Sequence, residues 1–144
     1  HRVSTTDSNS TDVLTPFELP YGGHNASPLY VQDKKILLTF DTNNRKTGAW
    51  RFNGAGDFEE LWVHDIANSN QVLYYPNTGE VVLDDVLDDK TVDAVVIDIE
   101  TGEEKGRTAT GTRYPAAMAF YPGLNRDCYS TSGVEGVLYR VFVS

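Results

Sequence analysis

The sequence is short of several features that define common protein classes. It has one cysteine, Cys128, in 144 residues, so no disulfide can form within the chain. It has 12 Lys and Arg against 21 Asp and Glu, a formal net charge of −9. Nucleic-acid binding depends on neutralising phosphates with basic side chains, so direct binding to DNA or RNA is not expected. No apolar run approaches the ~20 residues that span a bilayer, which predicts no membrane insertion.

Helical periodicity is also scarce, and this favours an all-β fold. Apolar residues occur instead in short runs rich in β-branched and aromatic types, with turn residues such as Pro76-Asn77-Thr78-Gly79 between them. The expected strands cover residues 36–40, 50–52, 61–65, 72–75, 81–83, 92–99, 104–108, 116–121 and 138–143. Nine or ten strands at this spacing predict an antiparallel β-sandwich or a jelly-roll-like β-barrel.

The two ends of the sequence differ in character. Residues 1–12 are polar and unpatterned, which is typical of a flexible linker or an expression scar. Residues 13–144 are expected to form a single β domain, since about 130 residues bury enough surface for one core. The strand pattern continues almost to Ser144, which indicates a natural C-terminus held in a sheet.

Four carboxylates lie within six residues, at Asp84, Asp85, Asp88 and Asp89. Calcium prefers several oxygen ligands, so this loop is a candidate calcium site and the only cofactor site that the pattern indicates. The spacing is not that of an EF-hand. The alternative is a solvated acidic turn that keeps strand edges apart.

Signals for catalysis are weak. Asp98 and Glu100 share one face of a strand, but a third acid is missing at Val96, and the alternation fits an outward polar face. His1 and a second histidine, among His24 and His64, could form a copper-binding pair only if His1 were the mature N-terminus. We therefore predict a protein that is not an enzyme.

Large aromatic side chains are numerous for one small core. We predict that some of them form a homodimer interface, because interface cores combine aromatic area with polar tips. Trp62, His64, Tyr74 and Tyr75 are the expected contact residues.

The chain combines an acidic, disulfide-free β domain with a hinge-like segment, Leu14-Thr15-Pro16-Phe17-Glu18-Leu19-Pro20, and a closing strand over residues 137–143. In these features it resembles the protrusion domain of the capsid proteins of small non-enveloped RNA viruses, in particular the nodaviruses of prawns and shrimps. The resemblance implies dimeric spikes on the virion surface that contact a host-cell receptor or glycan, and a calcium site formed by paired acids.

A secreted carbohydrate-binding or copper-dependent polysaccharide-active domain is the alternative. The two hypotheses differ in what should precede His1. A capsid protein would have a longer, arginine-rich start, and a secreted protein would have a signal peptide.

Overall fold

The computed structural model describes residues 19, 28–54, 57–69, 72–121 and 125–144. These residues form eleven β-strands, and the described part of the chain contains no helix. The predicted all-β antiparallel fold is confirmed, with one strand more than the upper expected number. A helix with the length and apolarity of a transmembrane span is likewise absent from the described residues. The prediction of a linker over residues 1–12 falls outside them.

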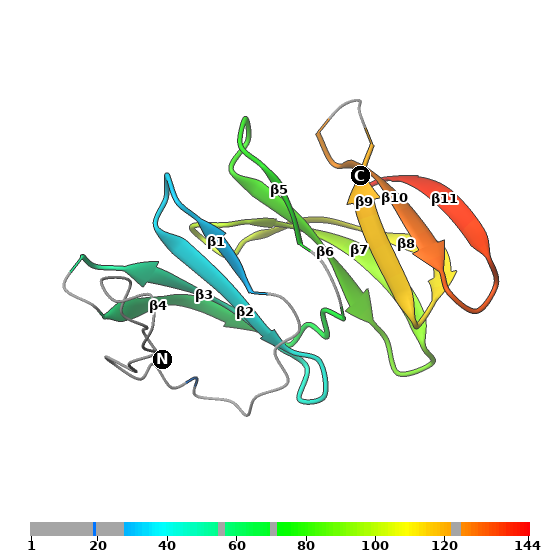
Figure 1. Cartoon of the computed structure of the whole chain (residues 1–144), viewed down its shortest axis with the longest axis horizontal. Helices are drawn as coiled ribbons and strands as arrows, with labels where there is room; N and C mark the ends of the chain where they lie inside the picture. The colour runs from blue at the N-terminus through cyan, green and yellow to red at the C-terminus, as the bar shows by residue number, and fades with distance from the viewer. Residues whose placement is uncertain (1–18, 20–27, 55–56, 70–71, 122–124) are drawn as a thin grey trace, which may run out of the picture.

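The strands form three antiparallel sheets, and the order within each sheet follows the order in the chain. The first sheet contains β1 (Leu29–Val31), β2 (Ile36–Asp41), β3 (Lys46–Phe52) and β4 (Phe58–His64). The middle sheet contains β5 (Val72–Tyr75), β6 (Glu80–Val86), β7 (Thr91–Asp98) and β8 (Glu104–Arg113). The third sheet contains β9 (Ala116–Phe120), β10 (Asp127–Ser132) and β11 (Val137–Phe142). The sheets lie side by side in a sandwich-like row and do not close into a barrel (Figure 1).

The two central strands of the middle sheet, β6 and β7, are largely buried on both faces. Successive residues of a strand point to opposite faces, so a strand covered on both sides is apolar without alternation. One face packs against the first sheet; this cluster includes Leu83, Val95 and Ile97 with Leu38 and Trp62.

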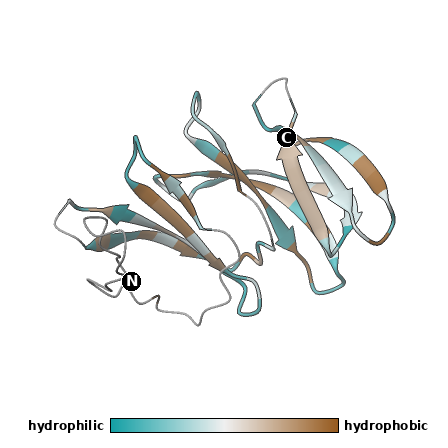
Figure 2. Cartoon of the chain, viewed as in Figure 1, coloured by the Kyte–Doolittle hydropathy of each residue, from teal (hydrophilic) through white to brown (hydrophobic). Residues whose placement is uncertain are grey.

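The opposite face of the middle sheet packs against the third sheet. This second cluster joins Val82 and Val96 to Met118, Cys128 and Val141. The hydropathy colouring shows the same concentration of apolar residues in the strands (Figure 2). The row of sheets therefore has two apolar interfaces, and the middle sheet contributes to both.

Three hairpin turns share one local design. Lys35, Arg45 and Lys90 each donate the backbone N–H to the carbonyl three residues earlier, at 3.2, 3.3 and 2.9 Å. Each of these residues has a left-handed backbone conformation, with φ of 55°, 53° and 71°. Such a position usually holds glycine or asparagine, because a Cβ atom is disfavoured there. A long basic side chain is therefore fixed at the same point of each turn.

The meander brings several connections together at one end of the row. Turns 42–45 and 87–90, connection 65–69 and turn 114–115 lie at this end, on the lower side of Figure 1. Val86 donates its N–H to the carbonyl of Ala67 at 3.1 Å, and Tyr114 donates to Lys90 at 2.8 Å. We call this the pocket end, since a pocket opens there.

A glycine comparison tests the packing of the first sheet against the middle sheet. A Cβ atom at Gly102 would lie 2.5 Å from Cγ of Trp62, whereas one at Gly54 would meet nothing within 4 Å. Both glycines have positive φ, 75° and 85°. We expect Gly102→Ala to lower the free energy of unfolding by about 1–3 kcal/mol more than Gly54→Ala, because overpacking adds to the shared backbone strain. Urea denaturation measures both; equal losses would contradict the packing described.

Candidate functional site: a polar pocket at one end of the sheets

A pocket of about 360 Å³ opens at the pocket end, between the connections of the first and middle sheets. Its walls come from three turns and from the segment that joins the two sheets. The lining residues are Thr42, Asn43, Arg45, Ala67, Val86, Leu87, Asp88, Lys90 and Tyr114. Most of the polar groups in this wall belong to turns, and their positions depend on how the strands behind them are held.

Asp85 anchors one wall of the pocket. Its carboxylate is buried, and Oδ1 accepts hydrogen bonds from the guanidinium of Arg45 and from the backbone N–H of Ala67, both at 3.0 Å. Arg45 also donates to the carbonyl of Val86 at 2.5 Å. The Arg45 side chain thus bridges the β2–β3 turn to the middle sheet, and its charge is already compensated by Asp85.

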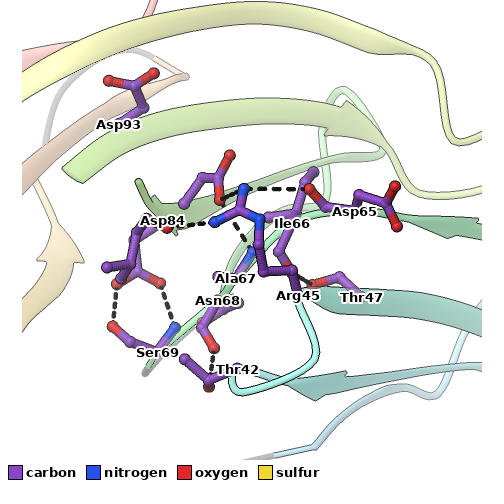
Figure 3. Close-up of polar contacts among 12 residues, drawn as sticks. Thr42, Arg45, Thr47, Asp65, Ile66, Ala67, Asn68, Ser69, Asp84 and Asp93 are labelled. Atoms are coloured by element: carbon purple, nitrogen blue, oxygen red, sulfur yellow. Dashed lines mark hydrogen bonds and ion pairs between the residues drawn. The ribbon is translucent and has the colours of Figure 1, made fainter. Parts of the chain in front are cut away.

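Asp84 anchors the same connection from the opposite face of β6. Its carboxylate is buried and accepts hydrogen bonds from the backbone N–H of Ser69 at 3.0 Å and from the Ser69 hydroxyl at 2.5 Å (Figure 3). Thr42 and Thr47 complete the arrangement by donating to the carbonyls of Asn68 and Ile66. Connection 65–69 is consequently fixed by side chains from both adjoining sheets.

A second arginine balances the charge of Asp85. Arg107 donates to Asp85 Oδ2 at 2.9 Å and to Asp93 at 3.2 Å, and it pairs with Glu104 at 3.0 Å. Its hydrogen bond to Glu104, followed by those to Asp85 and Asp93, raises the pKa of Arg107. The buried carboxylate therefore faces two guanidinium groups and contributes little net field to the pocket.

Four polar side chains in the pocket wall remain available to a ligand. Asn43, Asp88, Lys90 and Tyr114 are exposed, and none has a side-chain hydrogen bond or ion pair in the described part of the chain. The ring of Tyr114 is 45% exposed. One ammonium, one carboxylate, one amide and one phenol thus surround an opening with almost no net charge.

The structure separates the four acids of the predicted calcium loop. Asp84 and Asp85 lie in β6 on opposite faces and accept hydrogen bonds from protein groups, whereas Asp88 and Asp89 are exposed in the β6–β7 turn. Hydrogen bonds from Thr91 hold the pKa of Asp89 below its ordinary value. Within the described ranges, no group of three His, Cys, Asp or Glu is placed to hold a metal ion. Calcium binding stays a prediction, and the described residues do not form a ready-made set of calcium ligands.

Two of the four residues predicted to form a homodimer interface are buried within one chain, so the prediction is corrected for these two. Trp62 is 7% exposed and donates its indole N–H to the carbonyl of Ile99 at 2.9 Å. Tyr75 is also 7% exposed and donates its hydroxyl to the carbonyl of Asp127 at 2.7 Å. Burial raises the pKa of Tyr75 to about 12. These rings pack between sheets of one chain and offer no area to a partner.

The other two expected contact residues, His64 and Tyr74, are partly buried. His64 Nε2 lies 2.5 Å from the carbonyl oxygen of Gly102, and its ring packs in a tilted arrangement against Trp62 with centroids 5.1 Å apart. Tyr74 packs at the margin of the cluster between the first and middle sheets. Both residues therefore help to hold β4 and β5 within the chain.

The remaining candidates for catalysis do not converge on the pocket. Asp98 accepts hydrogen bonds from the backbone of Glu100 and Thr101 in the β7–β8 turn, at the other end of the sheets. Glu100 pairs with Arg51 at 2.8 Å. His1 and His24 lie outside the described residues.

The sequence analysis did not identify four residues of the pocket, Asn43, Arg45, Lys90 and Tyr114. A signal was nevertheless present, because turns 32–35, 42–45 and 87–90 each end in Lys or Arg after a polar pair. That shared pattern indicates a repeated turn with a basic side chain at a fixed place. Which turns meet around one opening depends on sheet topology, which local patterns do not encode.

The chain was compared with known families, curated proteins and solved structures. No family model matches it, and no curated protein matches it. Its structure is similar to the periplasmic gluconolactonase PpgL of Pseudomonas aeruginosa, with a TM-score of 0.60 at 14% identity. It is also similar to an uncharacterized protein of Listeria monocytogenes EGD-e, with a TM-score of 0.51 at 14% identity.

In both comparisons the match covers 83% of this chain and 40% of the other, so the chain spans less than half the length of these proteins. At this identity the likeness concerns the fold.

The anchoring role of Asp85 can be tested with a matched pair of variants. We expect Asp85→Asn to lower the free energy of unfolding by about 2 kcal/mol or more, because it leaves Arg45 and Arg107 without a buried counter-charge. The value lies at the low end for buried pairs because both guanidinium groups are partly exposed. Asp88→Asn, in the exposed turn, should change stability by less than about 0.5 kcal/mol. Thermal and urea unfolding measure the two; similar effects would show that Asp85 is not an anchor.

Proposed function

We propose that this domain is a binding module whose pocket end takes a neutral, hydroxyl-rich ligand, namely a sugar residue of a glycan. The observation that carries the proposal is the set of Asn43, Asp88, Lys90 and Tyr114 around one opening without partners in the described chain. Binding sites combine an apolar contact with a few fixed polar groups that set orientation. The pocket has this composition.

The chemistry of the wall suits a sugar better than an ion. Asn43 both donates and accepts hydrogen bonds, Asp88 accepts and Lys90 donates, so all roles that a hydroxyl group needs are present. The exposed ring of Tyr114 offers a flat apolar face for the C–H side of a sugar ring. Because Lys90 and Asp88 offset one another and Arg45 is paired with Asp85, no strong field selects for a charged ligand.

The residues that line the pocket favour binding of a sugar without a chemical reaction. Glycoside hydrolysis uses two carboxyl groups across the scissile bond, and the described lining contains one carboxylate, Asp88. The gluconolactonase among the similar structures is named for a sugar-derived lactone. That name gives modest support to a sugar-like ligand for the shared fold.

A glycan ligand is compatible with both hypotheses drawn from the sequence. A capsid protrusion on the virion surface would use the pocket to contact a host-cell glycan, and a secreted carbohydrate-binding domain would use it directly. The capsid assignment itself stays a prediction. The gene sequence that precedes His1 distinguishes the two.

The binding proposal is tested with two tyrosines of equal exposure. Tyr114 and Tyr30 are both 45% exposed, but only Tyr114 lines the pocket. We expect saturation-transfer NMR to detect neutral hexoses or N-acetylhexosamines bound to the wild-type protein. Tyr114→Ala should weaken binding by about tenfold, or 1.4 kcal/mol, and Tyr30→Ala should leave it unchanged.

Two results would count against the proposal. One is no sugar or glycan binding at millimolar concentration by a protein with native circular dichroism. The other is binding that Tyr30→Ala weakens as much as Tyr114→Ala. If the protein converted the bound sugar to a product, the domain would be an enzyme and not a binding module.

A further inference from the structure

The third sheet has one face that no described residue covers. Its inward side chains, among them Met118, Cys128 and Val141, pack on the middle sheet. The strand register places the opposite set together, with Ala119, Tyr129 and Arg140 in one row across the sheet and Ala117, Thr131 and Leu138 in the next. We call this side, together with Phe142 and Tyr121, the outer face.

The outer face is apolar and exposed at its β11 side. Leu138 is 61% exposed and Phe142 is 53% exposed. Tyr121 and Tyr129 form an edge-to-face pair with centroids 5.2 Å apart. The hydrophobic colouring on β9 and β11 marks the same sheet in Figure 2. The apolar sheet faces that form the two core clusters are each covered by a neighbouring sheet, whereas none of the described sheets covers the outer face.

The outer face also carries no uncompensated charge. Its ions are Arg140 and the buried Asp127, which pair through two hydrogen bonds of 2.7 and 3.0 Å. The Arg140 guanidinium also lies over the ring of Tyr121, 3.8 Å from its centroid. Hydrogen bonds from Arg140 hold the pKa of the Asp127 carboxyl below its ordinary value. In a chain with a net charge of −9, this is a surface where two copies can meet without bringing unpaired acids together.

We propose that the outer face is a homodimer interface, occupied by the outer face of a second copy of this chain. The contact is isologous, with a twofold axis between the two sheets and parallel to their strands. Such an axis places β11 of one copy over β9 of its partner. The strand register then places the large Leu138 above the small Ala117 of the other copy, and Arg140 above Ala119. The contact continues the face-to-face packing that already joins the three sheets of one chain.

The size of the face sets the strength of the dimer. Three strands of five or six residues cover roughly 300 Å² in plan, from the usual spacing of strands and residues. Stable complexes bury about 800 Å² on each partner. An interface this much smaller than the standard size predicts a weak dimer.

Sedimentation equilibrium from 10 to 500 μM tests the proposal. The wild-type protein should show a species of twice the 16.0 kDa chain mass and no larger series. Leu138→Lys should weaken association at least tenfold. The matched control is Val134→Lys, since Val134 is 71% exposed in the β10–β11 turn away from the outer face. Both variants reduce the net negative charge by one, so only a specific contact at Leu138 distinguishes them.

A third variant tests the proposed orientation. Ala119→Arg adds bulk where the partner's β11 would lie and should abolish the dimer, while circular dichroism and melting confirm the fold. The proposal is overturned by a monomer across the whole range, by an open-ended series of oligomers, or by Leu138→Lys dimerising as well as Val134→Lys. None of these variants changes a residue of the pocket, so the result is independent of sugar binding.

Discussion

The structure depends on a sheet that is apolar on both faces. In β6 and β7 the runs Val81-Val82-Leu83 and Val95-Val96-Ile97 are fully buried without alternation. A sheet of this kind cannot leave either side in water without losing about 25 cal/mol for each Å² of apolar surface that becomes exposed. A layer is therefore required on each side, and the first and third sheets supply the two layers. The order of packing in the row follows from this requirement.

Strand β6 also holds the wall of the pocket in place. The apolar run of β6 ends in Asp84 and Asp85, which point to opposite faces and are both buried. Each carboxylate accepts a backbone hydrogen bond from connection 65–69, through Ser69 and Ala67. Two adjacent acids thus hold connection 65–69 through hydrogen bonds from both faces of β6. Arg45 joins the neighbouring turn to Asp85. The acidity that resembles a calcium loop in the sequence serves, at these two positions, to hold the wall of a pocket.

The sequence predicted the fold class and most strands, because apolar runs and turn residues are local signals. It missed β10, where the inward residues Ser130 and Ser132 are polar and are accommodated by hydrogen bonds to Thr112 and to the carbonyl of Arg113. It also missed the three-residue β1. The aromatic residues Trp62 and Tyr75 were assigned to a surface because the core was assumed to be single. Three sheets in a row form two apolar interfaces, which have room for them.

The site was less predictable than the fold for a physical reason. Asn43, Lys90 and Tyr114 belong to three separate turns, and only the meander of the strands brings these turns to one end. No spacing along the chain reports this meeting. The acidic residues drew attention in the sequence because they are adjacent, whereas the groups open to a ligand are distant from one another.

Native-state hydrogen exchange tests most directly whether the middle sheet holds the others in place. If it does, backbone amides of β6 and β7 exchange most slowly, through global unfolding, and amides of the first and third sheets exchange faster through partial openings. Exchange in β2 and β3, or in β9 and β10, that is slower than in β6 and β7 would contradict the account, because it would place the most stable unit outside the doubly buried sheet.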